Sequence, residues 1–295
     1  MSVENIRIIE PHIHGGFGVN FNNANEDEIK TFAKNIKNYD VVAFYPTLAT
    51  DSVDNLKQQI NVIRNAQKNQ SPDEAKILGI HLEGCFLNPE KKGIHNPNYF
   101  MELTPENFKV LEGEDIIKLV TLAPELDKGL ISYLRSKGIK VHAGHTLASD
   151  CKGIDGTTHQ FNAMPKPTHE NFNNSVSYKA LIDDDIYCEI IADFVHNDYK
   201  TIKEFFETKP KDKIILVSDA LPISHANQDS IVFCDKVIFK NGKDANGTLG
   251  GSIMFLKEIV DNLIKKGFIT KSDAQDMTYY NPIRHLDIKE SDLYS

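Results

Sequence analysis

The amino-acid sequence predicts an α/β protein built as a single (β/α)8 barrel, and three observations lead to this. Eight apolar runs recur along the 295 residues, stretches with helical periodicity separate most of them, and polar residues stand at the ends of six runs. The length suits one such barrel, so residues 1–295 are expected to form one domain. An open, doubly wound sheet is the structural alternative.

The eight apolar runs have the composition of parallel strands that are buried on both faces, being rich in Ile, Val and Leu. In chain order they are residues 6–14, 41–48, 75–84, 116–125, 140–146, 156–162, 186–196 and 213–221. Eight strands that alternate with helices favour a closed barrel over an open sheet.

Three helices are identifiable because apolar residues recur every three or four positions. Asp51 or Ser52 is placed to cap the first of them. The three apolar faces consist of Val53, Leu56, Ile60 and Ile63; of Tyr199, Ile202, Phe205 and Phe206; and of Leu256, Ile259, Val260, Leu263 and Ile264.

Two connections depart from the regular alternation. Residues 233–247, after the eighth strand, predict a hairpin insertion with Asn241 and Gly242 at its turn. Only about nine residues, 147–155, separate the fifth and sixth strands. Because that is too short for a crossover helix, a single turn or a 3₁₀ segment is expected there.

Composition limits the partners and the compartment. The net charge of −9 argues against nucleic acid, whose phosphates require clusters of Lys and Arg. The polar first residues contain no signal peptide, and no apolar run approaches the roughly 18 residues of a membrane span. The four cysteines form no CxxC pair, so reduced thiols in the cytoplasm are expected. The sequence leaves assembly open, with a homodimer as one option.

Polar residues gather where a barrel carries its active site, at the C-terminal ends of the strands. Taken one at a time, a His here is more often a packing residue and an Asp more often a helix cap. His12 and His14, however, alternate on one strand and point to the same side, and a buried Glu83 is costly unless it is paired or bound to metal. The full set is His12, His14, His81, Glu83, His145, His159, Asp193, His196 and Asp219.

Together these residues predict a divalent metal site. Imidazole and carboxylate ligands suit Zn²⁺ first, with Fe²⁺ or Mn²⁺ as alternatives. Competing chemistries lack their motifs: no GxSxG is present, and the Gly-rich residues 247–252 lack the Lys of a P-loop. Cys85 lies two residues after Glu83 and offers a nucleophile or soft ligand, but a packing role is the better interpretation.

Several segments, in their order, resemble the N-acetylglucosamine-6-phosphate deacetylases of the amidohydrolase superfamily. The stretch from His81 to Pro97 is the most specific, whereas His12-Ile13-His14 alone would indicate only the superfamily. The matching segments are residues 11–16, 81–97, 144–146, 158–164, 219–220, 247–252 and 281–282.

The resemblance implies a hydrolase that removes the acetyl group of N-acetylglucosamine 6-phosphate, giving glucosamine 6-phosphate and acetate. It implies roles for individual residues. Glu83, His145 and His159 would hold the catalytic metal, and His12 and His14, with Asp219, would hold a second ion where two bind. Asp219 would be the general base and His95 would polarise the acetyl carbonyl. His196 would line the sugar site, and the backbone of Asn162 and Ala163 would face the phosphate.

Two departures from the family pattern bear on function. Family members build a small β-sandwich from segments that flank the barrel, and these are missing from the 295 residues. The family's phosphate-binding Arg is also absent, leaving Lys166, His169 and the backbone at Asn162 and Ala163 as candidates. Lys166 is the best cation among them. The departures keep two alternatives open, a deacetylase of another, unphosphorylated N-acetylated sugar and a non-catalytic sugar-binding relative.

Overall fold

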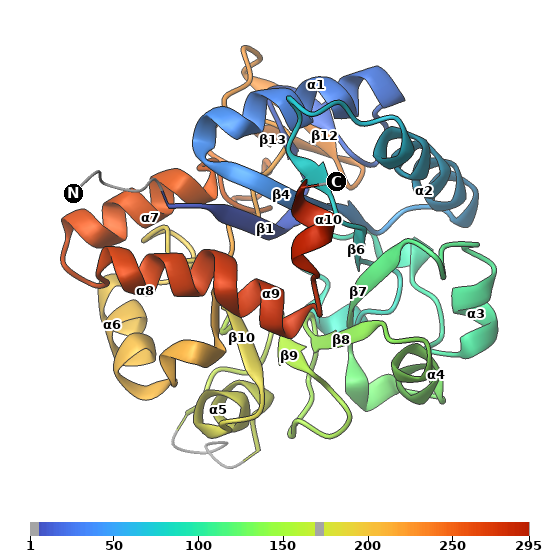
Figure 1. The fold of residues 1–295 in the computed structure, drawn as a ribbon. Helices are drawn as coiled ribbons and strands as arrows, with labels where there is room; N and C mark the ends of the chain where they lie inside the picture. Colours follow the sequence, from blue (N-terminus) through green and yellow to red (C-terminus); the bar gives the residue numbers. More distant parts are fainter. Residues whose placement is uncertain (1–5, 169–173, 295) are drawn as a thin grey trace.

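The structure, a computed structural model, describes residues 6–168 and 174–294, and its centre is a curled parallel sheet enclosed by helices (Figure 1). Eight strands follow one another in the sheet in the order of the sequence, as in a TIM-like barrel. They are β1 (Ile8–Ile13), β4 (Val41–Ala49), β6 (Ile80–Glu83), β7 (Ile117–Leu122), β8 (Lys140–Ala143), β9 (Gly156–Thr157), β10 (Tyr187–Ile190) and β11 (Ile214–Leu216).

Backbone hydrogen bonds bring the end of the last strand back to the first. The amide of Asp219 donates to the carbonyl of His12 at 3.0 Å, and the amide of His14 donates to the carbonyl of Ala220 at 2.9 Å. Spatial order therefore equals sequence order from β1 round to β11, which a doubly wound sheet with its reversal of strand order does not show.

Each of the eight predicted apolar runs contains a strand of the sheet, but most strands end earlier than the runs. The sixth is the extreme case, because only Gly156 and Thr157 of residues 156–162 pair with neighbours. Residues with positive φ follow closely, at His145 after β8 and at His159 after β9. A left-handed residue cannot continue a strand, so these side chains stand in loops just beyond the sheet.

The helices surround the sheet, and α8 and α9 cross one side of it (Figure 1). Ser52 caps α2 by accepting from the amide of Asn55, and Leu56, Ile60 and Ile63 are buried as expected. Tyr199 does not belong to the buried face of α6, because 57% of it is exposed. The helices are α1 (Glu26–Ile36), α2 (Val53–Lys68), α3 (Pro105–Lys109), α4 (Leu130–Ser136), α5 (Val176–Ile182), α6 (Tyr199–Thr208), α7 (Leu256–Lys265), α8 (Lys271–Gln275), α9 (Asn281–His285) and α10 (Glu290–Tyr294).

Short elements complete the architecture. The two-residue strand β5 (Lys76–Ile77) pairs with β4, and β2 (Gly15–Gly16) pairs with β3 (Val19–Asn20). A π-helix, Asp276–Tyr280, joins α8 to α9. Among the described residues, no helix combines the length and the apolar character that crossing a bilayer requires.

The two irregular connections contain the expected turns, and the first contains a further turn that was not expected. An antiparallel pair, β12 (Ser230–Phe233) and β13 (Lys236–Phe239), follows β11, and its strands are joined by a turn at Cys234-Asp235 that the sequence did not indicate. The chain turns again at Asn241-Gly242, as expected, where the amide of Gly242 donates to the carbonyl of Phe239 at 2.8 Å and the amide of Phe239 donates to the carbonyl of Lys243 at 2.9 Å. Cys234 and Asp235 both have positive φ, 50° and 61°, which is the geometry of a type I′ turn without glycine. Between β8 and β9 the chain uses a turn at residues 152–153 and bends, with no 3₁₀ segment.

Candidate metal centre

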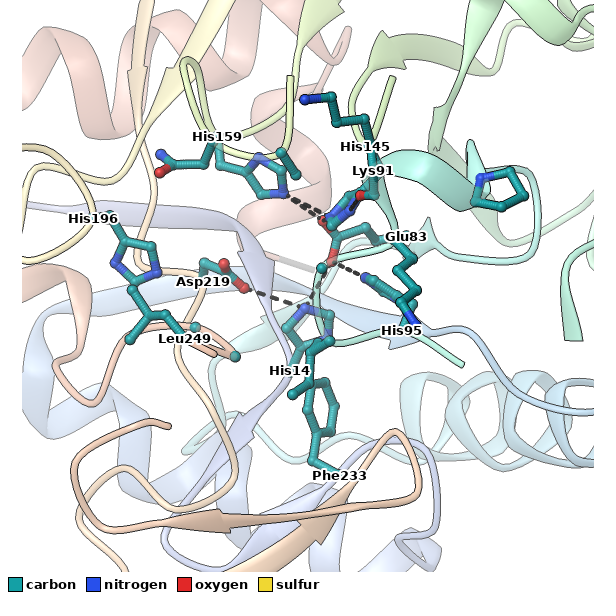
Figure 2. A pocket seen from close by; sticks show the side chains of 18 of the residues that line it. His14, Glu83, Lys91, His95, His145, His159, His196, Asp219, Phe233 and Leu249 are labelled. Atoms are coloured by element: carbon teal, nitrogen blue, oxygen red, sulfur yellow. Dashed lines mark hydrogen bonds and ion pairs between the residues drawn. The ribbon is translucent and has the colours of Figure 1, made fainter. Parts of the chain in front are cut away.

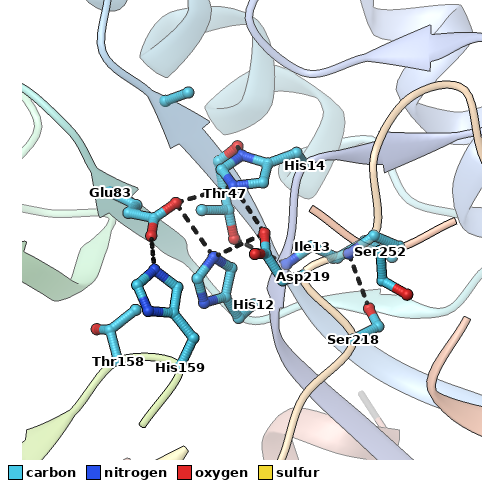
Figure 3. Close-up of polar contacts among 12 residues, drawn as sticks. His12, Ile13, His14, Thr47, Glu83, Thr158, His159, Ser218, Asp219 and Ser252 are labelled. Atoms are coloured by element: carbon cyan, nitrogen blue, oxygen red, sulfur yellow. Dashed lines mark hydrogen bonds and ion pairs between the residues drawn. The ribbon is translucent and has the colours of Figure 1, made fainter. Parts of the chain in front are cut away.

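Six polar side chains converge at the C-terminal ends of the strands, and Glu83 lies at their centre (Figures 2 and 3). One carboxylate oxygen, Oε1, is 2.9 Å from Nε2 of His159 and 3.4 Å from Nε2 of His145. The other, Oε2, is 2.9 Å from Nε2 of His14 and 3.2 Å from Nε2 of His12. The carboxylate of Glu83 therefore divides the histidines into two pairs.

Asp219 completes the pair formed by His12 and His14. Its Oδ1 lies 3.2 Å from Nε2 of His14 and 3.4 Å from Nε2 of His12 (Figure 3). Asp219, His145 and His159 have positive φ, at 52°, 48° and 32°. Left-handed backbone at non-glycine residues costs on the order of 1–3 kcal/mol each and persists only where the surroundings impose it. The strain turns these side chains towards the centre of the barrel mouth.

Hydrogen bonds on the far side of three rings assign their tautomers. Nδ1 of His14 lies 3.2 Å from the carbonyl of Thr47, and Nδ1 of His145 lies 2.8 Å from the carbonyl of Lys91. Because a carbonyl can only accept, Nδ1 carries the hydrogen in both rings. Nδ1 of His12 lies 3.4 Å from Oε2 of Glu189, a carboxylate, and therefore carries the hydrogen as well. In each ring Nε2 is left with its lone pair directed at the carboxylates.

His95 has the opposite tautomer. Its Nδ1 accepts from the amide of Thr50 at 3.4 Å and lies 3.0 Å from the Thr50 hydroxyl. The amide of Cys85 donates to that hydroxyl, whose own hydrogen is thereby directed to His95. Nε2 of His95 therefore carries a hydrogen, and it lies 3.9 Å from Oε2 of Glu83. His95 is a hydrogen-bond donor to the cavity, unlike its neighbours.

The donor set fits a divalent cation. Lone pairs of neutral imidazoles that face carboxylate oxygens at 2.9–3.4 Å repel one another unless positive charge lies between them. Ligand atoms about 2.1 Å from a tetrahedral Zn²⁺ are about 3.4 Å apart, close to these separations. Two groupings of described residues meet the distances for one ion, the first being His12, His14, Glu83 and Asp219, the second Glu83, His95 and His145. The tautomer of His95 argues against its being a ligand.

When no ion is bound, protons on the imidazole Nε2 atoms can take the place of the ion beside Glu83 and Asp219. Burial opposes ionisation of Glu83, but the charge of His12 and hydrogen bonds from His12, His14 and His145 hold the pKa of the Glu83 carboxyl well below its usual range. Burial lowers the pKa of His14, yet hydrogen bonds to Asp219 and Glu83 raise it above the ordinary value overall. The centre is therefore built around compensated charge, as a cation site must be.

A cavity of about 460 Å³ opens from this cluster to the surface (Figure 2). His196 is on its wall, and its Nδ1 is held 2.8 Å from Oδ2 of Asp193. Although burial opposes it, the hydrogen bond and charge of His196 lower the pKa of Asp193 to about 2. The lining residues are His14, Glu83, Pro89, Glu90, Lys91, Lys92, Gly93, Ile94, His95, His145, His159, Asn162, Ala163, His196, Asp219, Phe233, Leu249, Gly250 and Gly251.

The predicted site residues thus lie together, with few exceptions. Lys166 is exposed and is not among the residues that line the cavity, and His169 lies outside the described residues. His81 is fully buried beneath the cluster, with Nε2 2.7 Å from the Thr121 hydroxyl. The amide of Asn162 donates to the carbonyl of His159, so it is not available to a ligand.

Two lysines on the cavity wall escaped the sequence interpretation. Lys91 is the last residue of a 3₁₀ turn, Pro89–Lys91, that begins at the Asn88 cap, and Lys92 is its C-cap. In the part of the chain that the structure describes, neither lysine is within 4 Å of a carboxylate. Lys91 and Lys92 lie in the segment 81–97, which carries the family resemblance, and this position could have indicated that they are near the site.

Cys85 is expected to be inert. It is fully buried, burial raises the pKa of its thiol, and it does not line the cavity. Iodoacetamide should therefore leave Cys85 unmodified in the native protein, and Cys85→Ala should keep kcat close to that of the wild type. Mass spectrometry of the labelled protein and a kinetic assay test this; rapid labelling accompanied by loss of activity would contradict it.

The sequence is similar to those of several known deacetylases. No family model matches the chain. The chain is 32% identical over 304 residues to N-acetylglucosamine-6-phosphate deacetylase of Haemophilus influenzae, covering 96% of this chain and 76% of that protein. It is 30% identical to the Bacillus subtilis enzyme of the same name and 26% identical to N-acetylgalactosamine-6-phosphate deacetylase of Escherichia coli O157:H7. Those two alignments cover 95% of this chain and 74% and 77% of the relatives.

Solved structures of N-acetylglucosamine-6-phosphate deacetylases are similar to this one over most of the chain. N-acetylglucosamine-6-phosphate deacetylase from Pasteurella multocida superposes with a TM-score of 0.86 at 30% identity, covering 96% of this chain and 76% of that one. The Thermotoga maritima enzyme of the same name gives a TM-score of 0.86 at 25% identity, covering 95% and 78%. The fold and the order of its strands are thus those of these enzymes.

Proposed function

The chain belongs to the N-acetylglucosamine-6-phosphate deacetylase family, and from this premise we propose that it hydrolyses the N-acetyl group of N-acetylglucosamine 6-phosphate. The products are glucosamine 6-phosphate and acetate. One observation carries the proposal: Glu83, four imidazoles and Asp219 converge at the floor of a cavity that His95 enters as a donor. Residues 1–295 act as one catalytic domain with a hairpin insertion. Cytoplasmic location and assembly as a homodimer stay predictions.

Glu83 lies between two groups of possible metal ligands. Glu83, His145 and His159 would hold the catalytic ion, Zn²⁺ by the chemistry of its ligands, with Fe²⁺ or Mn²⁺ as alternatives. Oε2 of Glu83, with His12 and His14 and Asp219, is the place for a second ion. The division of the Glu83 oxygens between the two pairs of histidines supports this arrangement.

The residues then have separate tasks. A bound divalent ion lowers the pKa of a water molecule towards ~7 and polarises an amide carbonyl. Asp219 accepts the proton of the attacking water and delivers it to the departing amine. Nε2–H of His95 donates to the acetyl oxygen as negative charge develops there. His196, held by Asp193, binds a sugar hydroxyl at the cavity wall.

An assay of acetate release tests the function directly. The purified, metal-loaded protein should deacetylate N-acetylglucosamine 6-phosphate faster than N-acetylgalactosamine 6-phosphate or unphosphorylated N-acetylglucosamine. If N-acetylgalactosamine 6-phosphate is deacetylated faster, the substrate is instead the one for which the E. coli relative is named. Failure to release acetate from any of the three, with metal bound, would favour the non-catalytic sugar-binding alternative.

Recognition of the 6-phosphate is proposed to depend on Lys91 and on the amide of Ala163. Both residues line the cavity, and Ala163 N–H donates to none of the described residues, whereas Lys166 stands outside it. Lys91→Gln should lower kcat/KM for the 6-phosphate about ten- to hundredfold, the range expected for one charge-assisted hydrogen bond, with little change for the unphosphorylated sugar.

The matched control is Lys166→Gln, which removes an exposed lysine that does not line the cavity. We expect it to leave the preference for phosphate unchanged. If Lys166→Gln instead raises KM selectively for the 6-phosphate, Lys166 supplies the missing cation as the sequence suggested. If the wild type deacetylates both sugars equally well, phosphate is not part of its specificity.

A further inference from the structure

A chain of buried polar side chains runs from the metal centre into the barrel, away from the cavity. Glu189, on β10, is fully buried, and its Oε2 lies 3.4 Å from Nδ1 of His12. Its Oε1 lies 3.4 Å from Nδ1 of His142, on β8. Neither Oε1 of Glu189 nor Nδ1 of His142 has a hydrogen bond of good geometry in residues 6–168 and 174–294, so each is the closest available polar partner of the other. The two atoms face each other in the core.

The chain continues to a helix at the rim of the sheet. Nε2 of His142 lies 2.6 Å from Nε2 of His285, the last residue of α9. His285 is 3% exposed, and its ring packs on Tyr187 with centroids 4.3 Å apart. Four side chains, His12, Glu189, His142 and His285, thus connect β1, β10, β8 and α9.

The backbone leaves room for this chain. A Cβ at Gly156, on β9 between β8 and β10, would lie 2.5 Å from Nε2 of His142, closer than real Cβ contacts allow. Only glycine at this position lets the His142 ring sit between its two partners. A glycine in a strand interior often marks a place where another group approaches closely, and here that group is the buried ring of His142.

One set of tautomers satisfies every link. His12 must keep a lone pair on Nε2 to bind an ion, so its Nδ1–H is directed to Oε2 of Glu189. His142 directs Nδ1–H to the other oxygen, which leaves its Nε2 as an acceptor. His285 then donates Nε2–H to His142. In this arrangement two N–H groups, one on His12 and one on His142, face the carboxylate of Glu189.

We propose that Glu189 is a positioning residue that fixes the metal-binding tautomer and orientation of His12, and that His142 and His285 hold Glu189 in turn. The inference rests on the proposed metal site, and it adds that affinity for the ion depends on residues that do not touch it. A carboxylate behind a histidine ligand raises the basicity of the ring and prevents its rotation.

Metal affinity in solution tests the inference without reference to catalysis. Glu189→Gln offers one acceptor and one donor in place of two acceptors, so one of its two histidine partners loses its acceptor. We expect the dissociation constant for Zn²⁺, measured by competition with a chromophoric chelator, to rise about ten- to hundredfold, the usual effect of losing such a partner. The visible spectrum of the Co²⁺-loaded protein should change at the same time, because His12 is reoriented.

Two further variants separate positioning from stability. His285→Gln, which removes the far end of the chain, should weaken Zn²⁺ binding in the same direction by a smaller factor. Glu10→Gln is the matched control: Glu10 is a second fully buried glutamate inside the barrel, but its oxygens accept backbone amides of His12 and Ser218. It should lower the melting temperature of the protein and leave the zinc dissociation constant unchanged.

The outcomes are distinct from those of the functional proposal. A folded Glu189→Gln variant with wild-type zinc affinity and an unaltered Co²⁺ spectrum would overturn the inference, as would equal weakening by Glu10→Gln. A wild type that binds no divalent ion would overturn it too. A wild type that binds zinc tightly, responds to these variants as expected and releases no acetate would leave the inference standing and remove the proposed function.

Discussion

Glu83→Gln is expected to remove most of the bound metal and to lower kcat/KM by more than about 10³-fold, which corresponds to ~4 kcal/mol. Both carboxylate oxygens face imidazole Nε2 atoms, and the neutral amide is a poor ligand for a hard divalent ion. Only the amide nitrogen can donate to imidazole lone pairs, so the two imidazoles that face the amide oxygen would still lack a positive partner. Metal content by elemental analysis and steady-state kinetics measure the two losses.

The control for Glu83→Gln is Asp244→Asn, another neutralisation of a buried carboxylate. Asp244 is 6% exposed and accepts the amides of Asn246 and Thr248, in a loop that contributes no ligand. It should lower stability without changing the metal content. If Glu83→Gln keeps full metal and normal turnover, the assignment of Glu83 to the metal centre is wrong.

Strand periodicity was sufficient to predict much of the metal centre. His12 on β1 and His14, directly after β1, reach the same carboxylate, as their spacing indicates. The position of His145 and His159 in loops could not be read from the sequence, because it depends on positive φ values that non-glycine residues rarely adopt. Tertiary packing imposes these values, so only the structure shows how closely the rings approach.

Other features depend on contacts between distant segments and were therefore missed. Asn241-Gly242 is a strong local signal and the chain turns there, but Cys234-Asp235 carries no such signal and turns because Phe233 and Ile238 pack in a cluster with Leu221. The link from Glu189 to His142 joins β10 to β8 through space, and no local pattern indicates it.

Asp219→Asn should separate chemistry from metal binding. Asn has the same shape as Asp and tolerates left-handed backbone, so the φ of 52° at this position adds no strain. The backbone bonds from the Asp219 amide to His12 and from the Ser252 amide to Asp219 are retained. What is lost is the base: an amide cannot accept the proton of water, so kcat should fall about 10²–10⁴-fold.

The same variant should keep its fold and the ion held by Glu83, His145 and His159, because that half-site does not include Asp219. Circular dichroism, melting temperature and zinc content measured beside kcat make the distinction. A parallel loss of stability and activity would identify Asp219 as a structural residue. Loss of all bound metal would instead place Asp219 among the essential ligands, and the proton would then need another acceptor, for which His196 on the cavity wall is a candidate.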